Sequence, residues 1–125
     1  PAGAEDDSAL DGSDARPRVS SDEYREHLAW MIDECRRRGA EAVVVAWPIL
    51  PQAAGIQLAG RSRMISDNQR LAAEASREHG ASFVDLVPIL AGRTDLFIDI
   101  VHLNPDGYAL VANALLGPIE GLMNP

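Results

Sequence analysis

The feature that most constrains the fold is the short apolar run Glu41-Ala-Val-Val-Val-Ala-Trp47, which ends at Pro48. Its β-branched residues favour a strand, and they follow one another without the alternation of a strand that faces water on one side. Such a continuous run is typical of a parallel strand that is covered on both faces. Ser82–Leu86 is a second short run that predicts a strand, and it lies far enough along the chain for a helix to connect the two. The sequence therefore predicts a parallel sheet.

A helix with strong local signals precedes the first strand. Ser20 and Glu23 have the Ser-x-x-Glu spacing of a capping box, which predicts Ser20 as the N-cap. Apolar residues then recur at helical spacing, and Gly39 supplies a stop directly after a run of arginines that favours a helix C-terminus. Trp30 lies beside this apolar stripe, so we expect it to have a structural role.

Two more helices are predicted after the first strand. One runs from about residue 63 to residue 79. The other begins with Asn104 as its N-cap and Pro105 at its first position, and it is expected to end at Gly117-Pro118. Residues 88–95, which follow the second strand, predict a turn region that could include one helical turn.

The predicted order of elements is α-β-α-β-α, which implies parallel strands with helices on both faces. Residues 1–19 are acidic and rich in Gly, Ala, Ser and Pro. We expect them to form an acidic loop or arm, because they offer too little apolar surface to offset the entropy of ordering. Residues 20–125 are then predicted to belong to one domain.

Composition and charge exclude several classes of function. Hydrophobic residues make up 46% of the chain and charged residues 24%, which is typical of a globular domain. The net charge of −8 argues against a nucleic-acid partner, which needs a basic face, and no apolar run reaches membrane-spanning length. The single Cys35 excludes an internal disulfide. No histidine pair has zinc-site spacing and no glycine-rich loop cradles a phosphate, so we predict neither a metal nor a cofactor.

A carboxylate and a histidine stand close together just before the last predicted helix. Asp99 precedes His102 by three residues, in what is expected to be a loop. A hydrolytic histidine needs one ring nitrogen free to take a proton and the other bonded to a carboxylate, and this spacing lets the two side chains curl toward each other. The position fits as well, because ligands of open α/β sheets bind in the loops beyond the carboxyl ends of the strands. On spacing alone, a turn capped by Asp99 and a packed His102 remains the simpler interpretation.

The wider pattern, Asp99-x-x-His102-x-Asn104-x-x-Gly107-Tyr108, resembles the last conserved block of the SGNH (GDSL-type) hydrolases. These are serine esterases and lipases built on a flavodoxin-like three-layer α/β/α sandwich. The resemblance extends over about residues 20–116, so residues 20–125 would be the C-terminal part of such a domain. It implies that His102 is the general base, that Asp99 orients it, and that the substrate is a small-molecule, carbohydrate or lipid ester.

The nucleophile of that family does not appear in this sequence. It is a serine in a Gly-Asp-Ser motif, whereas Asp11-Gly-Ser13-Asp14 has these letters in another order and follows no apolar strand. We therefore expect this chain to carry only the His-Asp half of a catalytic triad and to be inactive alone. The expected partner is the N-terminal part of the same domain, since strand 41–47 would otherwise present an unpaired edge. The alternative is a catalytically inactive binding or assembly module that keeps this fold.

Two residues at the carboxyl end of the first strand are candidates for substrate contact. Trp47 and Pro48 follow the strand directly, where they could wall a pocket for the acyl or leaving group. Ordinary core packing remains the simpler interpretation for Ile49 and Leu50.

Overall fold

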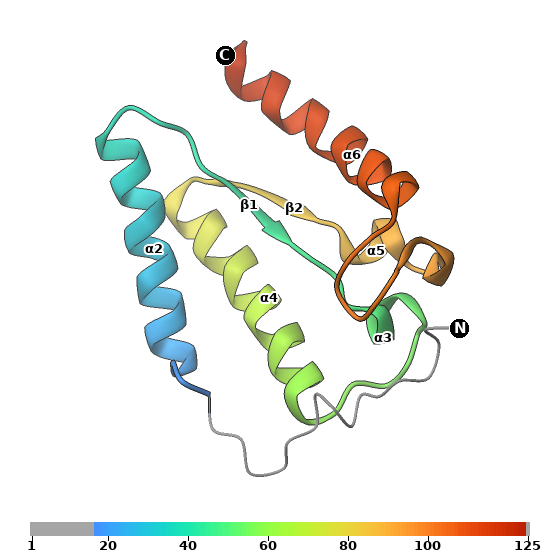
Figure 1. Cartoon of the computed structure of the whole chain (residues 1–125). Coiled ribbons are helices and arrows are strands. Elements are labelled where there is room, and N and C mark those ends of the chain that lie inside the picture. The colour runs from blue at the N-terminus through green and yellow to red at the C-terminus, as the bar shows by residue number, and fades with distance from the viewer. Residues whose placement is uncertain (1–16, 125) are drawn as a thin grey trace.

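The computed structural model describes residues 17–124, so the first sixteen residues of the predicted acidic arm lie outside the described residues. Figure 1 shows the arrangement of the elements. In chain order they are α2 (Ser21–Arg37), β1 (Val43–Ala46), α3 (Leu50–Ala53), α4 (Gly60–His79), β2 (Ser82–Asp85), α5 (Val87–Leu90), the 3₁₀ turn η1 (Thr94–Leu96) and α6 (Pro105–Met123).

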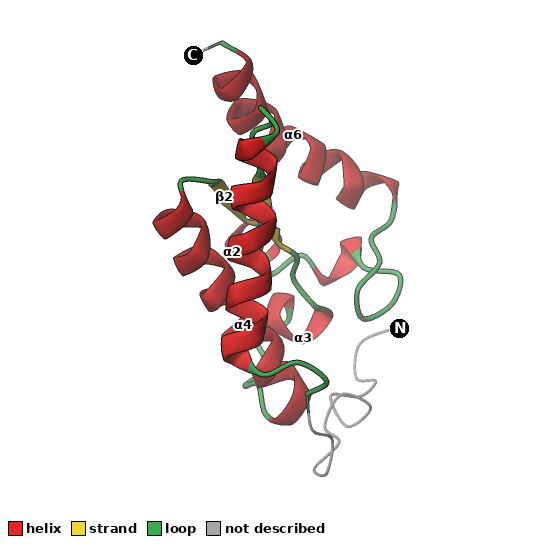
Figure 2. Cartoon of the chain, turned by 90° about the vertical axis from the view of Figure 1, so that its left-hand side faces the viewer, coloured by secondary structure: helices red, strands yellow, loops and turns green. Residues whose placement is uncertain are grey.

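The two strands form a parallel pair, as the sequence predicts. Val43 lies opposite Ser82 at one end of the pair, and Ala46 lies opposite Asp85 at the other. Helix α4 connects the strands and packs on both of them, with α2 packed against α4. Helix α6 contacts β2 from the other side of the strands, as Figures 1 and 2 show from two directions. The predicted order α-β-α-β-α and the three-layer α/β/α arrangement are confirmed.

The apolar core lies mainly on the α6 side of the strands. Leu86, Leu90 and Leu103 are fully buried there. This cluster joins the ends of the strands, the short helices and the start of α6, and its buried members are Leu50, Ala53, Val84, Leu86, Leu90, Leu96, Phe97, Leu103 and Val111. Leu96, Phe97 and Leu103 lie on either side of the Asp99–His102 segment in the sequence, so both ends of this segment are fixed in the core.

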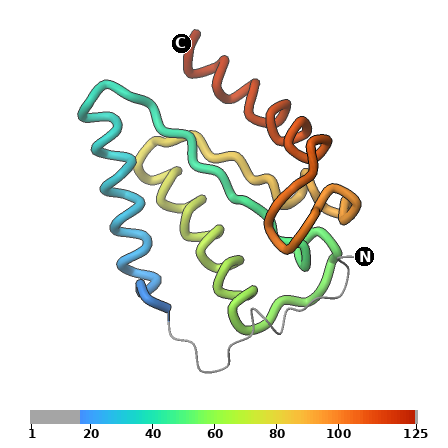
Figure 3. Tube along the Cα trace, in the orientation of Figure 1, coloured from blue at the N-terminus to red at the C-terminus, as the bar shows by residue number. Residues whose placement is uncertain are grey.

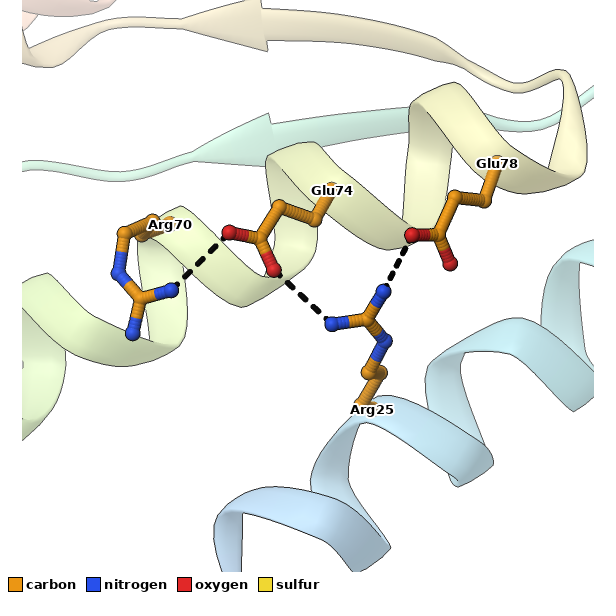
Figure 4. A network of polar contacts seen from close by, with 4 residues as sticks. All are labelled: Arg25, Arg70, Glu74 and Glu78. Atoms are coloured by element: carbon orange, nitrogen blue, oxygen red, sulfur yellow. Dashed lines mark hydrogen bonds and ion pairs between the residues drawn. The ribbon is translucent and has the colours of Figure 1, made fainter.

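Ion pairs join the two helices of the other layer. Arg25 on α2 lies 2.9 Å from the carboxylate of Glu74 on α4 and also pairs with Glu78, one turn further along α4. Arg70 lies 3.0 Å from the second oxygen of Glu74. Figure 4 shows the four residues as one network across the interface between the helices.

Several predicted boundaries are confirmed and others are wrong. Helix α2 begins with the predicted capping box: Ser20 Oγ accepts the N–H of Glu23, and the Glu23 side chain accepts the N–H of Ser20. Helix α6 does not end at Gly117-Pro118 but runs on to Met123. A proline there removes only one backbone donor close to the helix end, and the N–H groups that follow it continue the helical ladder.

Two further differences have tertiary causes. Helix α3 was not predicted, because its burial against the core is not visible in the local sequence: Leu50 and Ala53 are buried and the N–H of Leu50 donates to the carbonyl of Ile100. Trp30, expected to be structural, is 65% exposed on the outer side of α2. Helix α2 packs against α4 through another stripe, which leaves the indole in solvent.

The strand pair leaves backbone edges open. Within residues 17–124, β1 pairs only with β2, so each strand has one edge without a partner. The unpaired edge predicted for the first strand is therefore present in this part of the chain. None of the helices in the same residues is both long enough and apolar enough to cross a membrane.

Candidate active site

The Asp99–His102 segment is the tip of a closed loop between η1 and α6. Phe97 and Leu103 form an antiparallel bridge at its base. The N–H of Ile98 donates to the carbonyl of His102 at 2.9 Å, and the N–H of Asn104 donates to the carbonyl of Leu96 at 2.8 Å. Because both ends are buried and bonded, the tip is presented to solvent from a fixed base.

The carboxylate of Asp99 organises this tip. Its Oδ1 accepts the backbone N–H of Val101 at 2.9 Å and that of His102 at 2.7 Å, while Oδ2 lies 2.7 Å from Nδ1 of the His102 ring. The two backbone donors, together with the imidazole, lower the pKa of the Asp99 carboxyl below its usual value of 3.8. An ionised carboxylate can only accept hydrogen bonds, so Nδ1 must carry the proton in this pair.

The other ring nitrogen of His102 is therefore free to act as a base. Among residues 17–124, the imidazole is bonded to Asp99 alone, and the side chain is 62% exposed. A neutral ring with its proton on Nδ1 has a lone pair on Nε2, which can take a proton from a hydroxyl group. The structure thus brings together Asp99 and His102, as the sequence predicted.

The start of α6 also holds the loop in place. Asn104 is the N-cap as predicted: its Oδ1 accepts the N–H of Gly107 at 2.9 Å, and its Nδ2 donates to the carbonyl of Asp95 at 3.0 Å. Gly107 is buried, and a Cβ at this position would lie 2.8 Å from Cβ of Leu103. The first turn of the helix can approach the loop this closely only because it carries a glycine.

Trp47 lies against the loop rather than apart from it. Its indole Nε1 donates to the carbonyl of Val101 at 2.8 Å, and its ring centroid lies 6.1 Å from that of Tyr108. Figure 3 shows the loop before α6 running beside the segment that follows β1. Pro48, the next residue, is fully buried. The sequence did not predict the hydrogen bond from Trp47 to Val101, because no local pattern indicates a contact between residues 54 positions apart.

No described serine serves His102 as a nucleophile. Ser20 caps α2, and the buried Ser76 donates to the carbonyl of Ala72 at 2.7 Å. Ser13 lies outside the described residues. A cavity of about 230 Å³ does exist, but it lies on the α4 side of the strands, with Arg70, Phe83 and Asp85 in its lining and without Asp99 or His102. Within residues 17–124, no group of three His, Cys, Asp or Glu side chains could hold a metal ion.

A solved structure shares the fold of this chain. It is described as LAE5, an alpha/beta hydrolase enzyme from the metagenome of Lake Arreo, Spain, and it aligns with a TM-score of 0.66 at 17% identity. The match covers 79% of this chain and 47% of that one, so this chain spans about half the length of the matched structure. At this level of identity the likeness shows the fold. A search of curated proteins found no match.

The sequence also matches a family directly. The profile of the GDSL-like Lipase/Acylhydrolase family, a family of ester hydrolases, aligns with residues 8–110. This range covers most of the chain, including both strands and the loop that carries Asp99 and His102. The chain therefore belongs to the GDSL-like lipase/acylhydrolase family.

Proposed function

We propose that this chain supplies the His-Asp half of a serine ester hydrolase, with His102 as the general base and Asp99 as the residue that orients it. The observation that carries the proposal is the bond of 2.7 Å between Asp99 Oδ2 and His102 Nδ1, in a loop that leaves the His102 side chain exposed. Membership in a family of acylhydrolases supports the same chemistry.

The reaction is acyl transfer to water through a serine ester. Nε2 of His102 takes the proton of the serine hydroxyl while its oxygen attacks the ester carbonyl, and the imidazolium then returns the proton to the leaving alcohol. Water, activated by the same nitrogen, hydrolyses the acyl-enzyme. Asp99 stabilises the imidazolium as it forms, since its carboxylate stays ionised and is held by two backbone donors.

The nucleophile and the oxyanion donors belong to a part of the domain outside residues 17–124. Three observations support this: no described serine pairs with His102, the chain spans about half of the matched structure, and β1 has an open edge. Helix α6 also exposes Leu116, Ile119 and Met123. Further strands and a helix of the same domain would cover both this apolar side and the open edge.

The surroundings of His102 suit an ester with an apolar portion. Ile98 and Val101, in the same loop as His102, and Tyr108, in the first turn of α6, are exposed. Their apolar surfaces would contact the acyl chain or leaving group, and Trp47 would form the wall behind them. Pro48 is buried, so its part would be to support Trp47 rather than to touch substrate.

A fluorophosphonate probe tests the proposal, because it labels only an activated serine. We expect labelling of a protein that joins this chain to the serine-bearing part of the family fold, and loss of labelling when His102 is changed to Ala. His27→Ala is a matched control, since this exposed histidine on α2 has no hydrogen bond with the described residues. No labelling of the joined protein would favour the inactive binding or assembly module instead.

A further inference from the structure

We propose that Trp47 is a positioning residue, which sets the orientation of the peptide group that leads into His102. The inference rests on the proposed function, and it assigns Trp47 a role beyond that of a pocket wall. It begins with the Val101–His102 peptide. The carbonyl of this peptide accepts the indole N–H of Trp47 at 2.8 Å, and its N–H donates to Oδ1 of Asp99 at 2.7 Å.

This peptide group is therefore held at both ends. A rotation that broke the bond from Trp47 would also turn the N–H of His102 away from Asp99, because the carbonyl and the N–H share one rigid plane. The two bonds polarise the same peptide and strengthen each other. Since the plane ends at the Cα atom of His102, its orientation decides where the imidazole points.

Trp47 is itself fixed from the other side. Its backbone carbonyl accepts a hydrogen bond from Nε2 of Gln69 on α4 at 2.7 Å. Oε1 of Gln69 accepts a hydrogen bond from Nε2 of Gln52, also at 2.7 Å. Oε1 of Gln52 in turn accepts the N–H of Ile49 at 3.0 Å. The indole ring is tilted by 40° against the ring of Tyr108. A chain of hydrogen bonds therefore runs from α4 through the end of β1 to the loop.

Loss of the indole bond alone should leave the loop folded. The loop has a separate anchor at Ile100, whose carbonyl accepts the N–H of Leu50 at 2.7 Å, and its base is closed by the bridge between Phe97 and Leu103. Trp47 therefore acts on the alignment of His102 and not on the existence of the loop.

The test compares Trp47→Phe with Trp30→Phe. The first keeps an aromatic ring beside Tyr108 and removes the donor, whereas the second makes the same change at an indole that is 65% exposed and has no hydrogen bond with the described residues. In the protein joined to its serine-bearing part, Trp47→Phe should lower kcat about three- to tenfold, which is what one lost hydrogen bond supports, with KM unchanged. Trp30→Phe should change neither.

A second readout uses this chain alone and needs no activity. Amide hydrogen exchange at His102 should be faster in Trp47→Phe than in Trp30→Phe, and in the unmodified chain the indole N–H of Trp47 should exchange more slowly than that of Trp30. Equal indole exchange rates, or equal effects of the two substitutions on His102, would overturn the positioning role. If no form hydrolyses esters, the proposed function fails, and the exchange rates still decide the role of Trp47.

Discussion

Asp99 holds His102 at two points, with 2.7 Å from Oδ2 to the ring Nδ1 and 2.7 Å from the backbone N–H to Oδ1. A single carboxylate thus fixes both the main chain and the ring of the same residue. The imidazole has little freedom to turn while Asp99 is ionised, and the His102 side chain is 62% exposed. This arrangement would favour proton transfer in the proposed reaction, because a base that is already oriented needs no ordering when the reaction occurs.

Replacement of Asp99 by Asn should remove activity while preserving the loop. The Asn oxygen can still accept the N–H groups of Val101 and His102, but its amide would place donors opposite Nδ1 and favour the wrong tautomer of the ring. In the complete enzyme, turnover of a short ester should fall by a factor of up to roughly 10⁴. Asp106→Asn should leave turnover unchanged, and equal rates for both variants would exclude the orienting role.

The pH dependence should separate the two members of the pair. A protonated imidazole cannot accept a proton, so kcat/KM should fall as the solution becomes acidic. The pKa of Asp99 is lowered by folding, so its contribution to stability is complete above its usual value of 3.8 and is lost as pH falls through the lower, folded value. The ¹³C signal of its carboxyl should remain that of an ionised group at pH 5. An Asp99 carboxyl that becomes protonated over the same pH range in which kcat/KM falls would contradict this prediction.

Two glycines of α6 should respond in opposite directions to alanine. At Gly107, a new Cβ would meet Leu103 and Leu96, so Gly107→Ala should lower the free energy of unfolding by about 1–3 kcal/mol. A Cβ at Gly121 would meet no atom within 4 Å outside its own stretch of helix. Gly121→Ala should therefore raise the free energy of unfolding by about 0.5–1 kcal/mol through helix propensity. Urea unfolding measures both. A stabilising Gly107→Ala would show that α6 does not approach the loop as closely as described.

The ion pairs of Arg25 should stabilise the contact between α2 and α4 in a manner that depends on salt. Arg25→Ala leaves Glu74 and Glu78 without their partner on α2, so the melting temperature should fall at low ionic strength. The decrease should shrink in 1 M salt, since partly exposed pairs are screened. Arg63→Ala, on the same helix as the two glutamates and without an ion pair among residues 17–124, is the control. A decrease that is equal at both salt concentrations would point to lost packing instead.

The parts of the fold with local signals were predictable. The capping box at Ser20, the Asn104 cap and the two short strands depend on neighbouring residues, and the structure confirms each. The contact between Asp99 and His102 is also local, because a span of three residues can close only a few ways. The resemblance to the family block then indicated which chemistry to expect of this contact.

The parts that depend on distant residues were not predictable. Helix α3 forms where Leu50 meets the core and the loop at Ile100, and the bond from Trp47 to Val101 joins segments that no local pattern relates. The stop at Gly117-Pro118 was wrong because the proline removes only one backbone donor and the N–H groups after it continue the helical ladder. The cavity near Arg70 and Asp85 was missed because α4 and β2, which line it, meet only in the folded chain.

Hydrolysis of a short acyl ester by His102→Ala, in the protein joined to its serine-bearing part, is the most direct test of the account. His27→Ala serves as the control, because this exposed histidine on α2 has no hydrogen bond with the described residues. Far-ultraviolet circular dichroism establishes that both variants are folded. We expect kcat to fall by a factor on the order of 10⁴ or more for His102→Ala and to stay unchanged for His27→Ala. Undiminished hydrolysis by a folded His102→Ala variant would contradict the assignment of His102 as the general base.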